Sequence, residues 1–255
     1  MAIRLRNLLL TSAIAAAIVL PAAGPAAAFD ANERKEIESI IREYLLANPE
    51  VLLEVQDALE TKQVAAQREQ QQEAITKNTD TIFASATDPV LGNKDGSATV
   101  VEFFDYNCGY CKRALADMIS MMEVDSELKF VLKEFPILGP DSVAAHHVAF
   151  AFNDLYPEKY TEFHLRLLGH DGRANEDVAM KVATDLGGDE AKIRERMKDA
   201  SVEQRINETY QLASSLGING TPAYVIGDEI VSGALGASVL TTKVANVRQC
   251  GSTVC

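Results

Sequence analysis

A pair of cysteines, Cys108 and Cys111, most constrains how this chain can fold. The pair follows an apolar run at 99–106, rich in valine and phenylalanine as strands buried on both faces are. It precedes a helix-like segment at 112–122. At a helix N-terminus the first thiol lies beside free backbone N–H groups and the positive end of the helix dipole, and both favour the thiolate. The pattern therefore predicts a redox-active pair. A structural disulfide and half of a zinc site are the alternatives, although zinc would need a second pair of ligands.

The composition sets outer limits on the fold and the partners. The chain has 255 residues, of which 47% are hydrophobic, enough for one core with an appendage or for two small domains. Its formal net charge is −13. Nucleic acid is not expected as a partner, because binding it would require a basic patch.

Residues 1–28 have the pattern of a cleavable signal peptide. Arg4 and Arg6 precede an apolar stretch at 8–20, and the alanines at 26–28 offer a cleavage site. An uncleaved anchor is the alternative. Export would put the cysteines in an oxidising compartment, where disulfides persist.

Residues 29–85 are expected to form an N-terminal helical arm. Asn32 is the predicted N-cap of a first helix, and Asn48-Pro49 separates it from a second. Apolar residues recur at helical spacing in both helices, but the polar stretch 67–73 has little to bury. The arm is therefore either an oligomerisation segment or a helical cap on the main domain.

Residues 86–255 are expected to form one α/β domain. An edge strand at 88–92 and the strand at 99–106 precede the cysteine helix, and 128–135 alternates as the next strand, which completes a βαβ unit. A helical insertion follows at about 138–216, ending in one long charged helix from Asp189 to Gly217. A strand, a hairpin partner and a helix close the domain.

Over about 88–248, the chain resembles the DsbA-like family of thiol oxidoreductases. Three features carry the resemblance: V-E-F-F-D-Y-N-C-G-Y-C, the helical insertion, and G-I-N-G-T-P-A-Y-V-I-G. It implies an α/β thioredoxin-like fold with a helical insertion and, here, an N-terminal α-helical extension. It also implies catalytic residues: the nucleophile Cys108, the resolving Cys111 and the buried proton-transferring acid Glu102. The implied substrate-binding residues are Gly109 and Tyr110, which also tune the stability of the thiolate, and the cis-proline loop Thr221-Pro222. A solvent-facing Glu102 and a trans Pro222 are the alternatives.

The Gly-Tyr dipeptide and Thr221 are similar to those of DsbC-type isomerases and of ScsC-type proteins, which are linked to copper-stress tolerance. The ScsC-type plan adds an N-terminal oligomerisation segment, which residues 29–85 would supply. This resemblance implies a periplasmic disulfide isomerase or reductase that acts on exported cysteine-containing proteins, with a membrane thiol-redox partner and self-association through the arm. The alternatives are a dithiol oxidase and a copper-binding or chaperone module.

The remaining cysteines and the histidines lie outside these motifs. Cys250 and Cys255 are expected to form a structural disulfide, with free thiols or a second redox pair as alternatives. The histidines are expected at the surface or in a groove, because no ligand spacing matches a known metal site. They are His146, His147, His164 and His170. We therefore expect no metal and no cofactor.

Overall fold

A computed structural model describes residues 30–255, so the predicted signal peptide at 1–28 lies outside the described residues. The chain divides into two units, one ending at Leu59 and the other running from Glu60 to Cys255. Among the helices of 30–255, none is both long enough and apolar enough to cross a membrane.

The first unit contains α1 (Ala31–Ala47) and the start of α2 (Glu50–Lys77). The N-cap of α1 is Asp30, not the predicted Asn32. The Asp30 carboxylate accepts the backbone N–H of Glu33 at 2.9 Å, and the Glu33 carboxylate accepts that of Asp30 at 2.8 Å. This reciprocal capping box starts the helix at Ala31, so Asn32 lies inside it and its own N–H also donates to Asp30.

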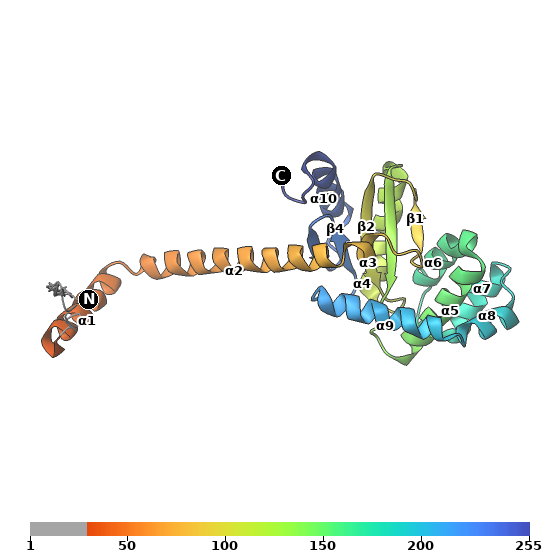
Figure 1. Ribbon diagram of the computed structural model, residues 1–255, viewed down its shortest axis with the longest axis horizontal. Coiled ribbons are helices and arrows are strands. Elements are labelled where there is room, and N and C mark those ends of the chain that lie inside the picture. Colours follow the sequence, from red (N-terminus) through yellow and green to blue (C-terminus); the bar gives the residue numbers. More distant parts are fainter. Residues whose placement is uncertain (1–29) are drawn as a thin grey trace, which may run out of the picture. The chain divides into compact units, whose positions relative to one another are not determined.

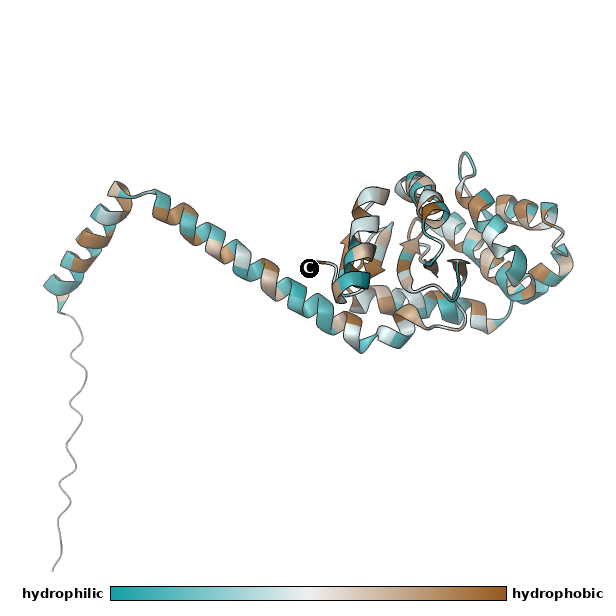
Figure 2. Cartoon of the chain, turned by 90° about the horizontal axis from the view of Figure 1, so that it is seen from above, coloured by the Kyte–Doolittle hydropathy of each residue, from teal (hydrophilic) through white to brown (hydrophobic). Residues whose placement is uncertain are grey.

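The apolar residues of this unit remain exposed. No residue of α1 is buried, and hydrophobic residues recur along α1 and the first part of α2 (Figure 2). The large exposed ones in 30–59 are Ile37, Ile40, Ile41, Tyr44, Leu46, Leu52, Leu53, Val55 and Leu59. A face of this kind marks an interaction surface more often than a free surface.

The second unit is built on a five-stranded sheet in the order β1-β3-β2-β4-β5 (Figure 1). The strands are β1 (Val90–Gly92), β2 (Ala98–Phe104), β3 (Leu128–Glu134), β4 (Ala223–Ile226) and β5 (Glu229–Ser232). Only β2 and β3 pair in parallel, through the crossover helix α4 (Gly109–Val124), and the other pairs are antiparallel. The expected thioredoxin-like α/β fold is thus confirmed.

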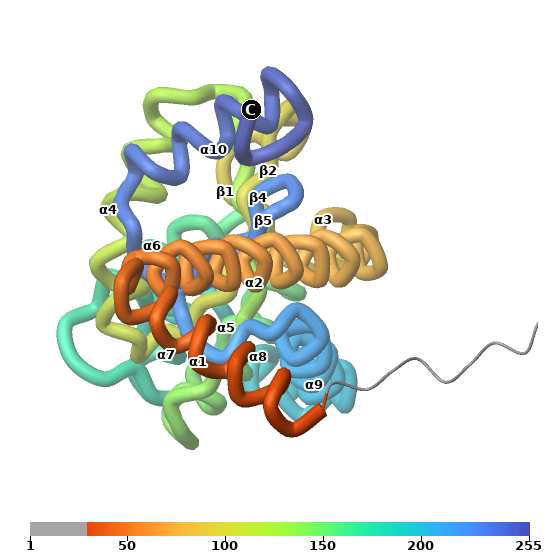
Figure 3. Tube along the Cα trace, turned by 90° about the vertical axis from the view of Figure 1, so that its left-hand side faces the viewer, coloured from red at the N-terminus to blue at the C-terminus, as the bar shows by residue number. Residues whose placement is uncertain are grey.

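Helices cover both faces of the sheet. Val100 and Phe104 of β2 pack toward α4 and α10 (Ala237–Cys250), which lie on the same side of the sheet (Figure 3). Val101 and Phe103 face the opposite layer, formed by the end of α2, α3 (Thr79–Phe83) and α9 (Ala200–Ser215). The alternation of β2 therefore separates two cores.

The helical insertion lies between β3 and β4. It comprises α5 (Pro140–Leu155), a short 3₁₀ turn (Pro157–Lys159), α6 (Tyr160–Leu168), α7 (Glu176–Asp185), α8 (Glu190–Met197) and α9. The predicted single helix from Asp189 to Gly217 is two helices, because the Asp199 carboxylate accepts the Ser201 N–H at 2.9 Å and caps a new one.

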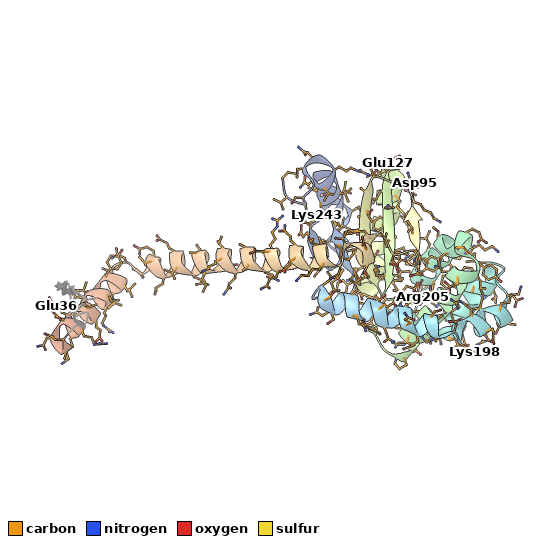
Figure 4. The ribbon with its side chains drawn as sticks, in the orientation of Figure 1. Glu36, Asp95, Glu127, Lys198, Arg205 and Lys243 are labelled. Atoms are coloured by element: carbon orange, nitrogen blue, oxygen red, sulfur yellow. A yellow bond between two sulfur atoms is a disulfide. The ribbon has the colours of Figure 1, made fainter. Side chains whose placement is uncertain are left out.

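An ion pair fastens α9 to the rest of the insertion. Arg205, labelled in Figure 4, donates two hydrogen bonds to Asp154 of α5, at 2.9 and 2.8 Å. Its guanidinium also lies 4.6 Å from the centre of the Phe150 ring. The pair is largely buried, and Arg196 also pairs with Asp154 at 2.6 Å, so loss of Arg205 would remove two charged hydrogen bonds while Asp154 keeps one partner.

The polar end of α2 is attached to the domain and not fully solvated. The carboxylate of Asp228, in the turn between β4 and β5, accepts a hydrogen bond from Gln72 at 2.8 Å and lies 3.4 Å from Arg68. It also accepts hydrogen bonds from the hydroxyl of Ser252 and the backbone N–H of Thr253, at 2.8 and 2.9 Å. Asp228 thus joins α2, the β4–β5 turn and the C-terminal loop.

Candidate active site

Cys108 lies at the junction of the β2 loop and α4, where its side chain is the N-cap of the helix. The backbone N–H of Cys111 donates to Cys108 Sγ at 3.4 Å, and the Cys108 thiol contacts the carbonyl oxygen of Thr221 at 3.1 Å. Cys108 is 5% exposed and Cys111 is fully buried. The helix start therefore presents one sulfur toward the Thr221 loop and keeps the other inside.

The two thiols differ sharply in acidity. A hydrogen bond from the Cys111 side chain, aided by the Thr221 side chain and by the backbone N–H groups of Tyr110 and Cys111, lowers the pKa of Cys108 to about 5 against the opposing effect of burial. Burial raises the pKa of Cys111, and the neighbouring Cys108 and Glu102 raise it further. At neutral pH the outer sulfur is a thiolate and the inner one a thiol, which suits one attacking and one waiting sulfur.

The Thr221-Pro222 segment faces Cys108 from the start of β4. The peptide bond between these residues is cis. Gly109 and Tyr110 are exposed at the first turn of α4, and the Arg113 guanidinium lies 4.1 Å from the centre of the Tyr110 ring. Of the predicted residues, Thr221 contacts the Cys108 sulfur, and Gly109 and Tyr110 follow it in the first turn of α4.

Glu102 is buried in the middle of β2, 2% exposed, and pairs with Tyr224 of β4 in the sheet register. As an even-numbered residue it shares the α4 side of β2 with Val100 and Phe104. Burial, followed by the charge of Cys108, raises the pKa of Glu102 to about 8, against an opposing interaction with the Tyr224 hydroxyl. A carboxyl with this pKa can take or give a proton near neutral pH.

The loop before Cys108 contains two polar residues that are not among the predicted site residues. Asp105 is fully buried, and its carboxylate accepts hydrogen bonds from the N–H of Leu138 and the hydroxyl of Ser142, at 3.0 and 2.8 Å. The Asn107 side chain exchanges hydrogen bonds with the backbone of Ala174, at 2.7 and 2.8 Å. Polar residues alternating with an aromatic one directly before the cysteines were the available signal.

The prediction that the histidines lie at the surface or in a groove is wrong for two of them. His146 and His164 are fully buried, because they lie on the inward faces of α5 and α6. His147 is partly exposed and contacts Glu203 at 3.1 Å. Within 30–255, no three His, Cys, Asp or Glu side chains gather as a metal site.

Cys250 and Cys255 are joined by a disulfide at the C-terminal end of α10, with 6.1 Å between their Cα atoms. Their sulfur atoms contact the carbonyl oxygens of Asn246, Ser252 and Val254, and none of the residues around Cys108. The disulfide is a separate feature that closes the loop bound to Asp228.

Known families match both parts of the chain. The DSBA-like thioredoxin domain matches residues 99–245, and the N-terminal domain of the copper resistance protein ScsC matches residues 33–66. The chain therefore belongs to the DsbA-like thioredoxin domain family. Within that family, the additional match at 33–66 gives it the plan of ScsC-type proteins.

Solved structures agree with this assignment. The crystal structure of a thioredoxin-like oxidoreductase from Silicibacter pomeroyi is 38% identical, covers 67% of this chain and 98% of its own, and has a TM-score of 0.64. ScsC from Proteus mirabilis in a transitional conformation is 29% identical and covers 86% of this chain and 96% of its own, also with a TM-score of 0.64.

Curated proteins match a little over half of the chain. The thiol:disulfide interchange protein DsbA of Bordetella pertussis is 28% identical over 152 residues, which are 57% of this chain and 70% of that protein. The Na(+)/H(+) antiporter NhaA 1 of Salinispora arenicola is 26% identical over 161 residues, but this chain spans only 24% of that protein's length.

Proposed function

We propose that this protein is an exported thiol-disulfide oxidoreductase that acts on protein disulfides, chiefly as an isomerase or reductase. One observation carries the proposal: Cys108 Sγ lies at the N-terminus of α4, beside the Thr221 carbonyl oxygen and above a buried Cys111. Family membership supports the same chemistry.

The reaction starts from the reduced pair. The Cys108 thiolate attacks one sulfur of a substrate disulfide, the substrate S–S bond breaks, and the departing substrate thiolate takes a proton. In isomerisation, another substrate thiolate then attacks the mixed disulfide and releases Cys108 unchanged, with no net electron transfer. In reduction, Cys111 loses its proton and attacks Cys108 Sγ, so the substrate leaves with two thiols and the enzyme keeps the disulfide.

Glu102 is proposed to take the proton from Cys111 in the reductive step. Cys111 is fully buried and its pKa is raised, so it needs a nearby base before it can attack. With a pKa of about 8, Glu102 is the group in this part of the core that can both accept and return a proton near neutral pH.

The preference for isomerase or reductase over oxidase rests on the N-terminal arm. The apolar residues of α1 and early α2 recur at helical spacing and are exposed, with Ile40 at 60% and Leu52 at 58%. We propose that a second copy of this chain covers them, in line with the ScsC N-terminal match at 33–66. Several active sites held together would raise the local concentration of thiolates around one misfolded client.

The location and partners follow from the same proposal. The basic and apolar pattern of 1–28 directs export, so the protein acts in the periplasm on exported proteins that contain cysteines. An isomerase must keep Cys108 reduced in an oxidising compartment, so it needs a membrane partner that supplies electrons.

Refolding of a scrambled disulfide protein tests the proposal. The wild type should restore its activity, whereas Cys108→Ser should not, although it should fold normally. Ile37→Lys with Ile41→Lys should lower the particle mass in light scattering and slow isomerisation, while a small disulfide substrate is still reduced. If the wild type instead only oxidises reduced substrates, the protein is an oxidase. If Cu(I) binds the reduced thiols and no turnover is measured, the protein is a copper-binding protein and the proposed enzymatic function is wrong.

A further inference from the structure

A buried polar cluster lies next to the active-site loop and plays no part in the thiol chemistry described above. It consists of Glu134 at the end of β3, His146 of α5, Tyr160 and His164 of α6, and Tyr106 of the loop. All five side chains are at most 2% exposed. Leucine or phenylalanine would fill the same space without the free-energy cost of burying polar groups, so the presence of five polar side chains requires an explanation.

The hydrogen bonds of His146 define where its ring proton lies. The backbone N–H of Tyr106 points to His146 Nε2 at 3.4 Å, and a backbone N–H can only donate. Nε2 must therefore accept, and the proton lies on Nδ1. From there it is donated to the Glu134 carboxylate at 2.8 Å. His146 is thus a neutral imidazole with one tautomer, held between a carboxylate and a backbone amide.

The rest of the cluster holds Glu134 in place. The Tyr160 hydroxyl donates to the second carboxylate oxygen of Glu134 at 2.6 Å, so both oxygens have a donor. Because the Tyr160 hydroxyl proton is used in the bond to Glu134, the Tyr106 hydroxyl is the donor to the Tyr160 oxygen, 3.2 Å away. Burial lowers the pKa of the adjacent His164 to about 3, so that ring adds no charge.

This cluster helps to hold the backbone of residues 105–107, the loop that leads to Cys108. Asp105 and Asn107 are fixed through their side chains to the insertion, as described above. Tyr106 lies between them, and its backbone N–H is fixed by His146. The backbone N–H of Cys108 then donates to the Asp105 carbonyl at 2.9 Å. Each of the three residues before the nucleophile thus has its own anchor.

We propose that His146, oriented by Glu134, is a positioning residue for Cys108: it fixes the Tyr106 amide and with it the backbone that places the sulfur at the start of α4. The inference rests on the proposed function only in taking Cys108 as the nucleophile. The proposal gives the helical insertion a role in positioning the nucleophile, because His146 and Tyr160 both belong to the insertion.

Nuclear magnetic resonance of the full-length wild type gives the first test. Ring ¹⁵N shifts of His146 should report a neutral imidazole protonated at Nδ1, and the Tyr106 amide should be strongly protected from hydrogen exchange. A ring protonated at Nε2, or a Tyr106 amide that exchanges freely, would overturn the proposal. Neither measurement depends on turnover, so the result stands apart from that of the refolding assay.

Substitutions test the link to the sulfur. His146→Leu removes both hydrogen bonds, and we expect it to raise the pKa of Cys108, read from thiolate absorbance at 240 nm, by about 1, a tenfold change in the ionisation equilibrium. His146→Gln retains one donor and one acceptor and should recover most of this difference. His147→Leu is the matched control, since that neighbouring ring is partly exposed and pairs with Glu203.

A purely structural role predicts a different result. It would lower the melting temperature of His146→Leu while leaving the Cys108 pKa at the wild-type value, and it would give His146→Gln no advantage at the thiol. Either outcome rejects the proposal. If His146→Leu does not fold, His146→Gln and the wild-type spectra decide.

Discussion

Replacing Glu102 by glutamine should stabilise the protein, and increasingly so as the pH rises. The buried carboxyl has its pKa raised from 4.5 in the unfolded chain to about 8 in the fold. Between those values the folded state holds a proton that the unfolded state has lost. The contribution of Glu102 is therefore fully present below pH 4.5 and is lost as the pH rises through about 8.

The size of this effect follows from the window. For one proton, a change of one pH unit changes the free energy of unfolding by about 1.4 kcal/mol, so the ceiling for the three units between pH 5 and pH 8 is about 4 kcal/mol. The surroundings of a buried charge relax, and we therefore expect about 2 kcal/mol. Glutamine has no carboxyl to ionise, so this part of the pH dependence should disappear in Glu102→Gln.

Urea unfolding of the reduced wild type and of Glu102→Gln at pH 5 and pH 8 measures the difference. The advantage of the variant should grow by about 2 kcal/mol between the two pH values, and by less in the oxidised forms, where Cys108 bears no charge. Glu127→Gln, a change of an exposed carboxylate labelled in Figure 4, is the control and should show no such growth. An advantage that is constant or shrinks with pH would refute the assignment of a buried, protonated Glu102.

Three further predictions concern the thiol, the insertion and the C-terminal loop. The rate at which iodoacetamide alkylates Cys108 should rise with pH, with a midpoint near pH 5. Cys111→Ala removes the hydrogen bond that contributes most to the low pKa of Cys108, so it should move this midpoint upward; an unchanged midpoint would contradict that cause. Arg205→Ala should lower the free energy of unfolding by about 2 kcal/mol in urea melts, because Asp154 keeps Arg196 as a partner, whereas Arg166→Ala, in an exposed pair with Glu162, should cost less than about 1 kcal/mol. Asp228→Ala should speed hydrogen exchange of the amides at 68–76, with a local loss of about 1–2 kcal/mol; equal protection in both proteins would show that the end of α2 is held by its apolar contacts alone.

Much of the fold is encoded locally and was therefore predictable. The valine- and phenylalanine-rich run of β2, the cysteines at a helix start and the alternation of β3 each identify an element by its period. The even spacing from Glu102 to Val100 and Phe104 is also local, and it predicts that Glu102 shares their side of the sheet.

The sequence-based predictions are wrong or incomplete where a polar side chain is bonded to a segment far away in the chain. His146 shares a face of α5 with Ser142, Ala145 and Ala149, all buried, so its inward direction could have been inferred from helical spacing. Its partner could not, because Glu134 reaches it only once β3 and α5 have packed. The same holds for Gln72 and Asp228, which are more than 150 residues apart in the chain.

The antiparallel register of β2 and β4 makes the active site sensitive to chain length more than to side-chain identity. Glu102 stands opposite Tyr224, and Phe103 opposite Ala223, the residue that follows Pro222. Deleting one residue from either strand would turn the Glu102 carboxyl to the other layer or shift Thr221 by about 3 Å relative to Cys108. Variation in this domain should therefore proceed by substitution within β2 and β4, while insertions and deletions are confined to the segments between the helices of the insertion.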